Sequence, residues 1–331
     1  MRYLKVFFLI SCLAIFTAAC GSSGGDSSGD GSDSAIQYTG LTTQATIDQG
    51  NAQDISTGSY QGGTTSSALT ASGVVQSENT VEIGRPRTMV LSQIFEDALQ
   101  KVDIASHSAA DFSGTTESST ETIPGDCGGE ATINMSYDDV TGNFNGTMNF
   151  NSYCSEGAVI SGSVDFSGKL DVTDEEFLYL NLSFNDVSTV SGGDSFTSTG
   201  TMNLDFTVSP ETATVNMLMK DNVSGKVYKI ENVFMTFKED SDYVYITMSG
   251  RFYDPDYGYV DLSTPVPFRF YADDEWPSQG ELFIDGNTGI AGGSTSAELI
   301  AVSTSLCEIN ADTDGDGELD DYLVQIPWTD L

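Results

Sequence analysis

Hydrophobic residues occupy every second position through much of this chain, and this alternation constrains the fold more than any other feature of the sequence. Between residues 160 and 172, Ile160, Val164, Phe166 and Leu170 share one phase, while Ser, Asp and Lys fill the other. Successive side chains of a β-strand point to opposite faces of a sheet, so such a segment forms a strand with one buried and one solvated face. Half-buried strands of this kind are typical of antiparallel sheets.

The same pattern recurs along the chain between segments rich in turn-forming residues. It is found at residues 178–184, 202–208, 215–219, 233–237, 244–252 and 322–328. Turn signals containing Gly, Asp, Asn or Pro lie at 191–194, 209–211, 222–225, 239–242 and 285–289. From residue 127 onward we therefore expect about a dozen strands in a mainly β fold, an antiparallel meander that forms a barrel or a sandwich.

One segment before residue 127 has a helical periodicity instead. Apolar residues from Val90 to Val102 recur at intervals of three and four, which predicts an amphipathic helix over about 88–109 that packs on the sheet. A helix that binds a membrane surface or a partner protein is the alternative. The polar face of this helix is not basic, which disfavours the membrane.

The segment from residue 36 to residue 73 carries weaker signals. Residues 36–47 are typical of a strand, and Asp48 is placed to cap a short helical turn over 51–55. The Ser, Thr and Gly content of 58–73 indicates a loop or linker. No later linker is long enough to separate two cores, so we expect a single β-rich domain over 36–331.

The N-terminus has the organisation of a targeting segment. Arg2 and Lys5 precede an apolar run that ends in Ala18 and Ala19, directly before Cys20. This arrangement resembles the signal peptide of bacterial lipoproteins. The resemblance implies that residues 1–19 are removed and that Cys20 is lipidated, with palmitate among the acyl groups. It also implies that the lipid anchors the protein in the outer membrane of the cell envelope. Ordinary secretory cleavage is the alternative. The apolar run is shorter than the ~20 residues that a retained membrane span needs.

The residues after Cys20 indicate a tether, and the charge of the chain limits its partners. Residues 20–35 comprise the predicted lipidated cysteine and a Gly/Ser/Asp segment whose composition is typical of flexible linkers.

The chain is strongly acidic. It has 12 Lys and Arg residues against 49 Asp and Glu residues, so the removal of Arg2 and Lys5 with the signal peptide leaves a net charge of 10 minus 49, or −39. Nucleic acid binding needs clustered positive charge, so we expect no nucleic acid partner. The membrane is the predicted partner through the lipid, and a protein or glycan partner stays open.

The remaining cysteines indicate an oxidising compartment. Cys12 leaves with the signal peptide and Cys20 is lipidated, so Cys127, Cys154 and Cys307 are left. One strand-like segment begins after Cys127, and the next one ends before Cys154, with a turn signal between the two. The start of the first strand of a hairpin lies opposite the end of the second. We therefore expect a Cys127–Cys154 disulfide and a buried free thiol at Cys307.

An acidic segment near the C-terminus has the spacing of a metal-binding loop. Its carboxylates are Asp312, Asp314, Asp316, Glu318 and Asp320, with glycine at 315 and 317. The segment resembles the D-x-D-x-D-G-x-x-D calcium loops of EF-hand-like, dockerin-like and β-propeller repeats. Calcium takes six to eight oxygen ligands, and the resemblance implies a structural Ca²⁺ held by these five residues. The twelfth position of the loop, which is acidic in the helical versions, is Leu323 in this chain. The flanking segments are strand-like, so we expect a loop between two strands. A metal-free acidic turn is the alternative.

Aromatic residues gather in the segment from 252 to 276. They include Tyr253, Tyr257, Tyr259, Tyr271 and Trp276. Such rings stack on sugars when they are exposed in a loop, but they more commonly pack in cores and hairpins.

Three hypotheses about function follow. The first is a lipid-anchored, non-catalytic envelope protein of structural or interaction type, and it is the one we favour. The second is a ligand- or carbohydrate-binding module that uses the aromatic residues above, and the third is a carboxylate-dependent hydrolase. His107 is the only histidine, which nearly excludes histidine-dependent catalysis, and we expect no enzyme. Outer-membrane barrels share the strand alternation, but the predicted anchor and the frequent glycines favour a globular β domain.

Overall fold

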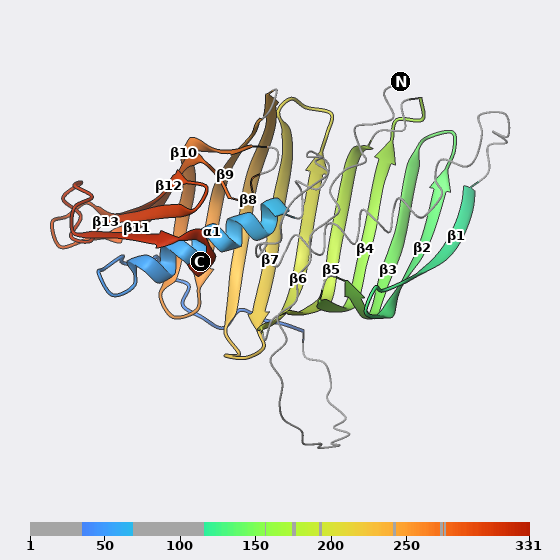
Figure 1. The fold of residues 1–331 in the computed structure, drawn as a ribbon, viewed down its shortest axis with the longest axis horizontal. Helices are drawn as coiled ribbons and strands as arrows, with labels where there is room; N and C mark the ends of the chain where they lie inside the picture. The colour runs from blue at the N-terminus through green and yellow to red at the C-terminus, as the bar shows by residue number, and fades with distance from the viewer. Residues whose placement is uncertain are drawn as a thin grey trace, which may run out of the picture.

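The strands form one antiparallel sheet in which each strand pairs with its neighbours in sequence (Figure 1). The computed structural model describes residues 35–68, 116–155, 157–173, 177–191, 194–240, 243–271, 274 and 276–331. The sheet has 14 strands in the order β1 to β14, which confirms the predicted mainly β meander. The predicted signal peptide, Cys20, the linker to residue 34 and the predicted helix at 88–109 lie outside the described residues.

The elements have the following bounds. The helix α1 spans Ala52–Ala68 and a 3-10 turn spans Trp328–Asp330. The strands are β1 (Thr116–Pro124), β2 (Gly128–Asp138), β3 (Asn143–Ser155), β4 (Ala158–Leu170), β5 (Phe177–Ser191), β6 (Asp194–Asp205), β7 (Glu211–Asp221), β8 (Val227–Asp240), β9 (Tyr243–Asp254), β10 (Gly258–Tyr271), β11 (Gln279–Thr288), β12 (Ser294–Ser303), β13 (Leu306–Asp312) and β14 (Tyr322–Pro327).

The alternation of the sequence sets which face of each strand is buried. In β4, Ile160, Val164, Phe166 and Leu170 are at most 4% exposed, and the residues between them carry the polar side chains. The same alternation recurs from β2 to β13, with a shift of the buried phase by one residue at bulges such as that between Phe184 and Val187, and the buried residues join in one continuous hydrophobic core. Val172, predicted in the same row, lies beyond the end of β4 and is exposed.

The sheet is open. Within the described residues β1 pairs with β2 only and β14 pairs with β13 only, so these two strands form its edges. Of the two expected arrangements, the described strands therefore do not form the closed barrel.

A line of β-bulges crosses the strands from β3 to β9. Register shifts occur in the β3–β4, β4–β5, β5–β6, β7–β8 and β8–β9 pairs, whereas the β6–β7 pair is regular, and Gly162, Gly200 and Gly250 adopt φ values of 115°, 150° and 141° along this line. At Gly250 an added Cβ would lie 2.6 Å from the Cα of Val233 on the neighbouring strand, so only glycine fits. Bulges bend and twist a strand, and a row of them bends the whole sheet.

The N-terminal segment is inserted between β10 and β11 where these two strands separate. The N–H of Tyr259 in β10 donates to the carbonyl of Thr43, and the N–H of Ala45 donates to the carbonyl of Tyr259. The N–H of Asn287 in β11 donates to the carbonyl of Ala45. The strand predicted over 36–47 is therefore reduced to an extended segment with a single parallel bridge, between Gln44 and Tyr259.

Helix α1 follows this segment and is longer than expected. The Oδ1 atom of Asp48 accepts hydrogen bonds from the N–H groups of Gly50 and Asn51, so the predicted cap is present. The helix then continues to Ala68, and the loop predicted for 58–73 is wrong for residues 58–68. A buried stripe of small side chains explains how so polar a segment packs as a helix, since Ala52, Ser56 and Ser59 are fully buried.

Figure 1 shows α1 crossing the C-terminal part of the sheet, where it contacts β8, β9 and β11 to β13. Close approach depends on glycine, because a Cβ on Gly62 would lie 2.9 Å from the Phe252 ring. Tyr60 packs edge-on against Phe268, with 5.3 Å between ring centroids, and lies 5.0 Å from Trp328. These contacts place α1 on the apolar face of the sheet, and the opposite face is polar.

The predicted disulfide is present. Cys127 and Cys154 are bonded, with their Cα atoms 5.1 Å apart, at the open end of the β2–β3 hairpin. Cys307 in β13 is free and fully buried, as expected.

Candidate functional site

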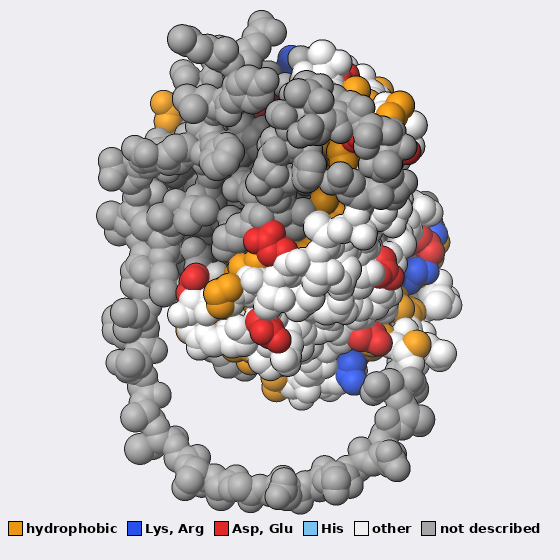
Figure 2. Space-filling model, turned by 90° about the vertical axis from the view of Figure 1, so that its right-hand side faces the viewer, with side chains coloured by type: hydrophobic (Ala, Val, Ile, Leu, Met, Phe, Trp, Pro, Cys, Tyr) orange, Lys and Arg blue, Asp and Glu red, His pale blue; other side chains and the backbone are white. Residues whose placement is uncertain are grey.

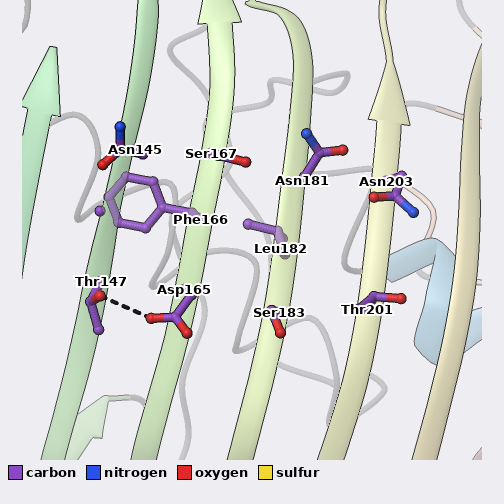
Figure 3. Close-up of a pocket in the computed structure, with 11 residues that line it drawn as sticks. Asn145, Thr147, Asp165, Phe166, Ser167, Asn181, Leu182, Ser183, Thr201 and Asn203 are labelled. Atoms are coloured by element: carbon purple, nitrogen blue, oxygen red, sulfur yellow. Dashed lines mark hydrogen bonds between the residues drawn. The ribbon is translucent and has the colours of Figure 1, made fainter.

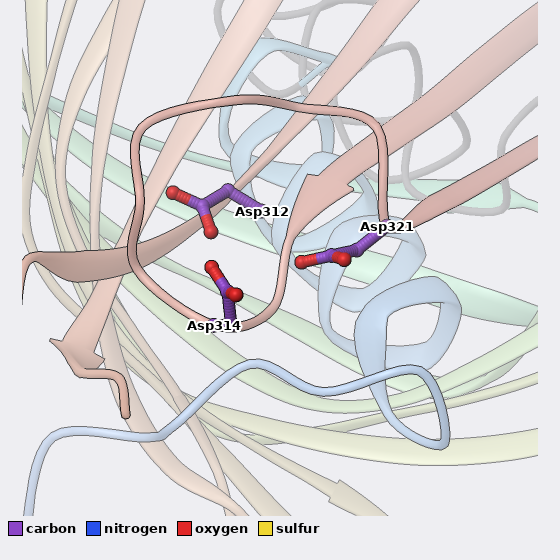
Figure 4. Close-up of side chains that lie close together, drawn as sticks. All are labelled: Asp312, Asp314 and Asp321. Atoms are coloured by element: carbon purple, nitrogen blue, oxygen red, sulfur yellow. The ribbon is translucent and has the colours of Figure 1, made fainter. Parts of the chain in front are cut away.

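The acidic segment forms the loop between β13 and β14, as the strand-like flanks predicted. Carboxylate oxygens of Asp312, Asp314 and Asp321 lie within 4.8 Å of one another and point into the loop (Figure 4). Asp316, Glu318 and Asp320, which the calcium-loop pattern also predicted as ligands, are not part of this group. Asp321 was missed because it lies one position beyond the pattern.

Hydrogen bonds from the loop backbone hold the carboxylates in place. The buried Asp312 carboxylate accepts the N–H groups of Gly315 at 2.6 Å and Gly317 at 2.8 Å, one on each oxygen. The Oδ2 atom of Asp321 accepts the N–H of Thr313 at 2.8 Å and its hydroxyl at 3.0 Å. Gly315 and Gly317 have φ values of 82° and 90°, which favour glycine, so both glycines of the motif are required by the turn.

The electrostatics of this loop are those of crowded negative charge. Desolvation raises the pKa of Asp314, and the nearby charges of Asp316, Asp321 and Asp312 raise it further, against a hydrogen bond from the Asp316 N–H. Hydrogen bonds from Thr313 lower the pKa of Asp321. A cation between the three carboxylates would relieve their repulsion, so this cluster can hold a metal ion.

The five predicted aromatic residues lie in separate clusters. Tyr253 is buried, donates its hydroxyl to Glu231 at 2.8 Å and lies 5.4 Å from Tyr259 between ring centroids. The guanidinium of Arg251 covers the Tyr259 ring at 3.9 Å. The hydroxyl of Tyr257 hydrogen-bonds to Asp54 of α1 at 3.2 Å.

The other two predicted aromatic residues pack elsewhere. Trp276 stacks on Trp328, with 5.4 Å between ring centroids and 4° between planes. Tyr271 packs edge-on against Tyr243 and is 40% exposed, the most open of the five. The structure therefore does not bring these aromatic residues together as one platform.

A different surface carries regular rows of polar side chains. The solvent face of strands β3 to β6 contains a shallow groove of about 420 Å³ between two rows of polar side chains (Figure 3). The strand backbone at Gly146, Phe166 and Leu182 lies between the rows. One row contains Asn145, Ser167, Asn181 and Asn203, and the other contains Thr147, Asp165, Ser183 and Thr201.

The strand register continues these rows across the N-terminal half of the sheet. The first row extends to Ser136 and Ser118 on one side and to Thr214 on the other, and the second extends to Asn134, Thr120 and Asn216. A third row runs parallel to them across β1 to β5: Thr122, Thr132, Asn149, Ser163 and Asn185. We call these three rows the polar face.

Every residue of the polar face is Ser, Thr or Asn except Asp165. The two oxygens of Asp165 accept hydrogen bonds from the Thr147 hydroxyl and the Asn185 amide, both at 2.9 Å. The side chains of Asn181 and Asn203 make no hydrogen bond to other described residues and are exposed. Seen from the β1 edge, the coloured surface is mostly white, with the acidic side chains spaced apart (Figure 2).

Two exposed aromatic rings border the polar face. Tyr179 precedes Asn181 by two residues on β5 and is 40% exposed. Phe234 pairs with Thr214, continues the first row onto β8 and is 44% exposed. Our sequence predictions missed this surface, although the Ser, Thr and Asn residues in the polar phase of successive strands were a readable signal.

Comparison with known proteins adds no relative. No family model, curated protein or solved structure matches this chain. Among the described residues, no helix is long and apolar enough to cross a membrane.

Proposed function

We propose that this chain is a lipid-anchored protein of the bacterial cell envelope with a non-catalytic, structural or interaction role. The observation that supports an interaction role is the polar face, an exposed and regular surface that uses the full width of seven strands. The core needs the apolar phase of these strands, but it does not require that the solvent phase be Ser, Thr or Asn. Mixed charged residues would solubilise the sheet equally well.

The anchor is proposed from the lipoprotein-like signal segment. Lipidated Cys20 would place the β domain at the outer membrane, on a linker of Gly, Ser and Asp that ends near residue 35. A flexible linker of this length has a root-mean-square span of roughly 20 Å. This distance lets the domain turn freely relative to the membrane, so that the polar face can meet a partner in the envelope.

Replacement of Cys20 tests the anchor. The mass of the wild-type N-terminal peptide should begin at Cys20 and include fatty acyl groups, whereas the Cys20→Ala protein should carry no acyl group. Wild-type protein that is soluble and unacylated after processing would contradict the proposal. Cys307→Ala is the matched control, because it removes a cysteine and should leave the acylation of the N-terminal peptide unchanged.

We also propose that the Asp312, Asp314 and Asp321 cluster binds Ca²⁺ in a structural role. The cluster supplies carboxylate oxygens from both ends of the β13–β14 loop, and such oxygens are the ligands that Ca²⁺ prefers. Bound Ca²⁺ would stabilise the folded state by RT ln(1 + c/Kd), where c is the free Ca²⁺ concentration, so the stability should rise with that concentration. Chelator should lower the thermal midpoint of the wild type and leave that of Asp314→Asn unchanged. A wild-type thermal midpoint that changes with neither Ca²⁺ nor chelator would refute the site.

A further inference from the structure

We infer that the polar face binds a neutral polysaccharide, whose chain lies across strands β3 to β6 in the groove between the first two rows. This inference rests on the proposed interaction role and specifies the chemical class of the partner. It uses a different surface from the aromatic residues that the sequence suggested.

The side chains of the polar face match the chemistry of sugar hydroxyls. Ser and Thr hydroxyls and Asn amides each donate and accept hydrogen bonds, as sugar hydroxyls do. They are short, so that ordering them costs less conformational entropy than ordering Lys, Arg or Glu. They are uncharged, and their removal from water is therefore less costly than removal of an ionised group.

The charge of the molecule argues for a neutral partner. The full chain has a formal net charge of −37, which repels anionic polymers. A cationic polymer would be drawn to carboxylates, but the polar face carries a single one, Asp165, and both of its oxygens already accept hydrogen bonds. The polar face is therefore complementary to a polymer that carries hydroxyl groups and no charge.

The geometry of the polar face suits an extended and repetitive partner. Neighbouring strands lie about 4.8 Å apart, and alternate residues of one strand lie about 7 Å apart, so the three rows form a regular two-dimensional array. The groove follows the rows across four strands instead of ending in a closed pocket. A polymer with a regular repeat can make the same contact several times along such an array, which raises its affinity through multivalency.

The two bordering aromatic rings can pack against the apolar C–H groups of a sugar ring. Tyr179 lies beside the first row and Phe234 lies at its end, both on the solvent face. The face of an aromatic ring packs on the C–H groups of a sugar. A protein partner would fit less well, because protein interfaces have an apolar core and a polar rim, and this surface has the reverse arrangement.

Co-sedimentation of the full, lipidated protein in detergent with insoluble polysaccharides tests the inference. The probes are cellulose and curdlan as neutral glucans, starch granules as a neutral α-glucan, and calcium alginate gel as an anionic polymer. We expect binding to at least one neutral polysaccharide that persists in 1 M NaCl, and no binding to alginate. Since the contacts are uncharged, salt should have little effect.

Variants on and off the polar face provide the controls. Tyr179→Ala combined with Phe234→Ala should weaken retention by about tenfold, which corresponds to ~1.4 kcal/mol. Tyr271→Ala is the matched control, because this ring is equally exposed and lies off the polar face. Equal weakening by the control, or binding to alginate alone, would overturn the inference.

The failure of this inference can be told apart from the failure of the proposed function. If no neutral polysaccharide binds but the polar face is shielded from solvent in intact envelopes, the partner is of another class and only the polysaccharide inference fails. If no neutral polysaccharide binds and the polar face is fully accessible in envelopes, the interaction role fails as well.

Discussion

The Cys127–Cys154 disulfide should supply a large part of the stability of the N-terminal half of the sheet. The two cysteines are 27 residues apart in sequence and close the β2–β3 hairpin, next to the edge strand β1. Cross-linking a loop of this length removes chain entropy from the unfolded state worth about 3.5 kcal/mol. Cys127 is exposed, so replacing it with Ser costs little packing, and the double variant Cys127→Ser/Cys154→Ser mainly reports the cross-link.

The assay compares thermal and urea unfolding of the wild type and the double variant, each with and without dithiothreitol. A loss of 3.5 kcal/mol lowers the thermal midpoint of a domain of this size by about 7 °C. Dithiothreitol should produce a similar shift in the wild type and none in the double variant. Both proteins keep the buried Cys307 thiol, so its contribution cancels.

Two results would refute this reasoning. The first is a wild-type midpoint that does not change on reduction. The second is a double variant that responds to dithiothreitol as strongly as the wild type. Either result would mean that the cross-link does not limit the unfolded chain.

Three further predictions concern single residues. Gly250→Ala should lower the free energy of unfolding by about 2–3 kcal/mol, because its φ is positive and an added Cβ would meet the backbone of β8. Gly225→Ala is the control: its φ is also positive, but nothing lies within 4 Å of the added Cβ, so it should cost about 1 kcal/mol in the same urea titration. Asp312→Ala should cost roughly 3 kcal/mol by removing two charge-assisted hydrogen bonds to loop N–H groups, and a loss under ~1 kcal/mol would contradict the account of the loop. Burial raises the pKa of Cys307 from 9.0 to about 12, so the folded state holds a proton that the unfolded state loses. Its stabilisation is present below pH 9 and is lost at about 1.4 kcal/mol per pH unit between pH 9 and 12. The pKa values of Tyr60 and Tyr38 are raised as well, so Cys307→Ala should still lose stability above pH 10, but less steeply than the wild type by about this amount.

Local periodicity was enough to predict the meander, because a buried strand face needs apolar residues at every second position. The disulfide followed from the same pattern, since hairpin register places Cys127 opposite the end of the next strand. The bulge line could not be predicted in this way. Residues such as Gly162 and Gly200 read simply as gaps in the apolar phase, although their positive φ values let the sheet bend.

The errors have physical causes that can be traced to particular residues. The Ser, Thr and Gly content of residues 58–68 predicts a loop because this part of α1 buries small residues such as Ser59 and Gly62, and Gly62 permits a close approach to the Phe252 ring. Residues 36–47 have strand-like composition, but they fill the gap between β10 and β11 with only one bridge. The role of Asp321 depends on how the loop folds back onto Thr313, which no linear spacing rule contains.

The candidate sites show the same limit. The aromatic residues from Tyr253 to Trp276 lie within 24 residues of one another in sequence but pack into different clusters. Tyr253 and Tyr259 pair at one end of the β9–β10 hairpin, whereas Tyr271 pairs with Tyr243 at the other end and Trp276 stacks on Trp328. The polar face is the reverse case. Its residues are far apart in sequence and meet only because seven strands keep one register.

The accessibility of the polar face in the cell envelope tests the central claim most directly. Thr201→Cys places a thiol on the polar face, and Val223→Cys places one on the exposed β7–β8 turn as a control. The native cysteines give little background, because Cys127 and Cys154 are bonded and Cys307 is buried. Our account predicts that maleimide labels both new thiols in the purified lipidated protein, and that labelling at residue 201 alone is strongly slowed in intact envelopes. Equal labelling of residue 201 in both preparations would contradict it.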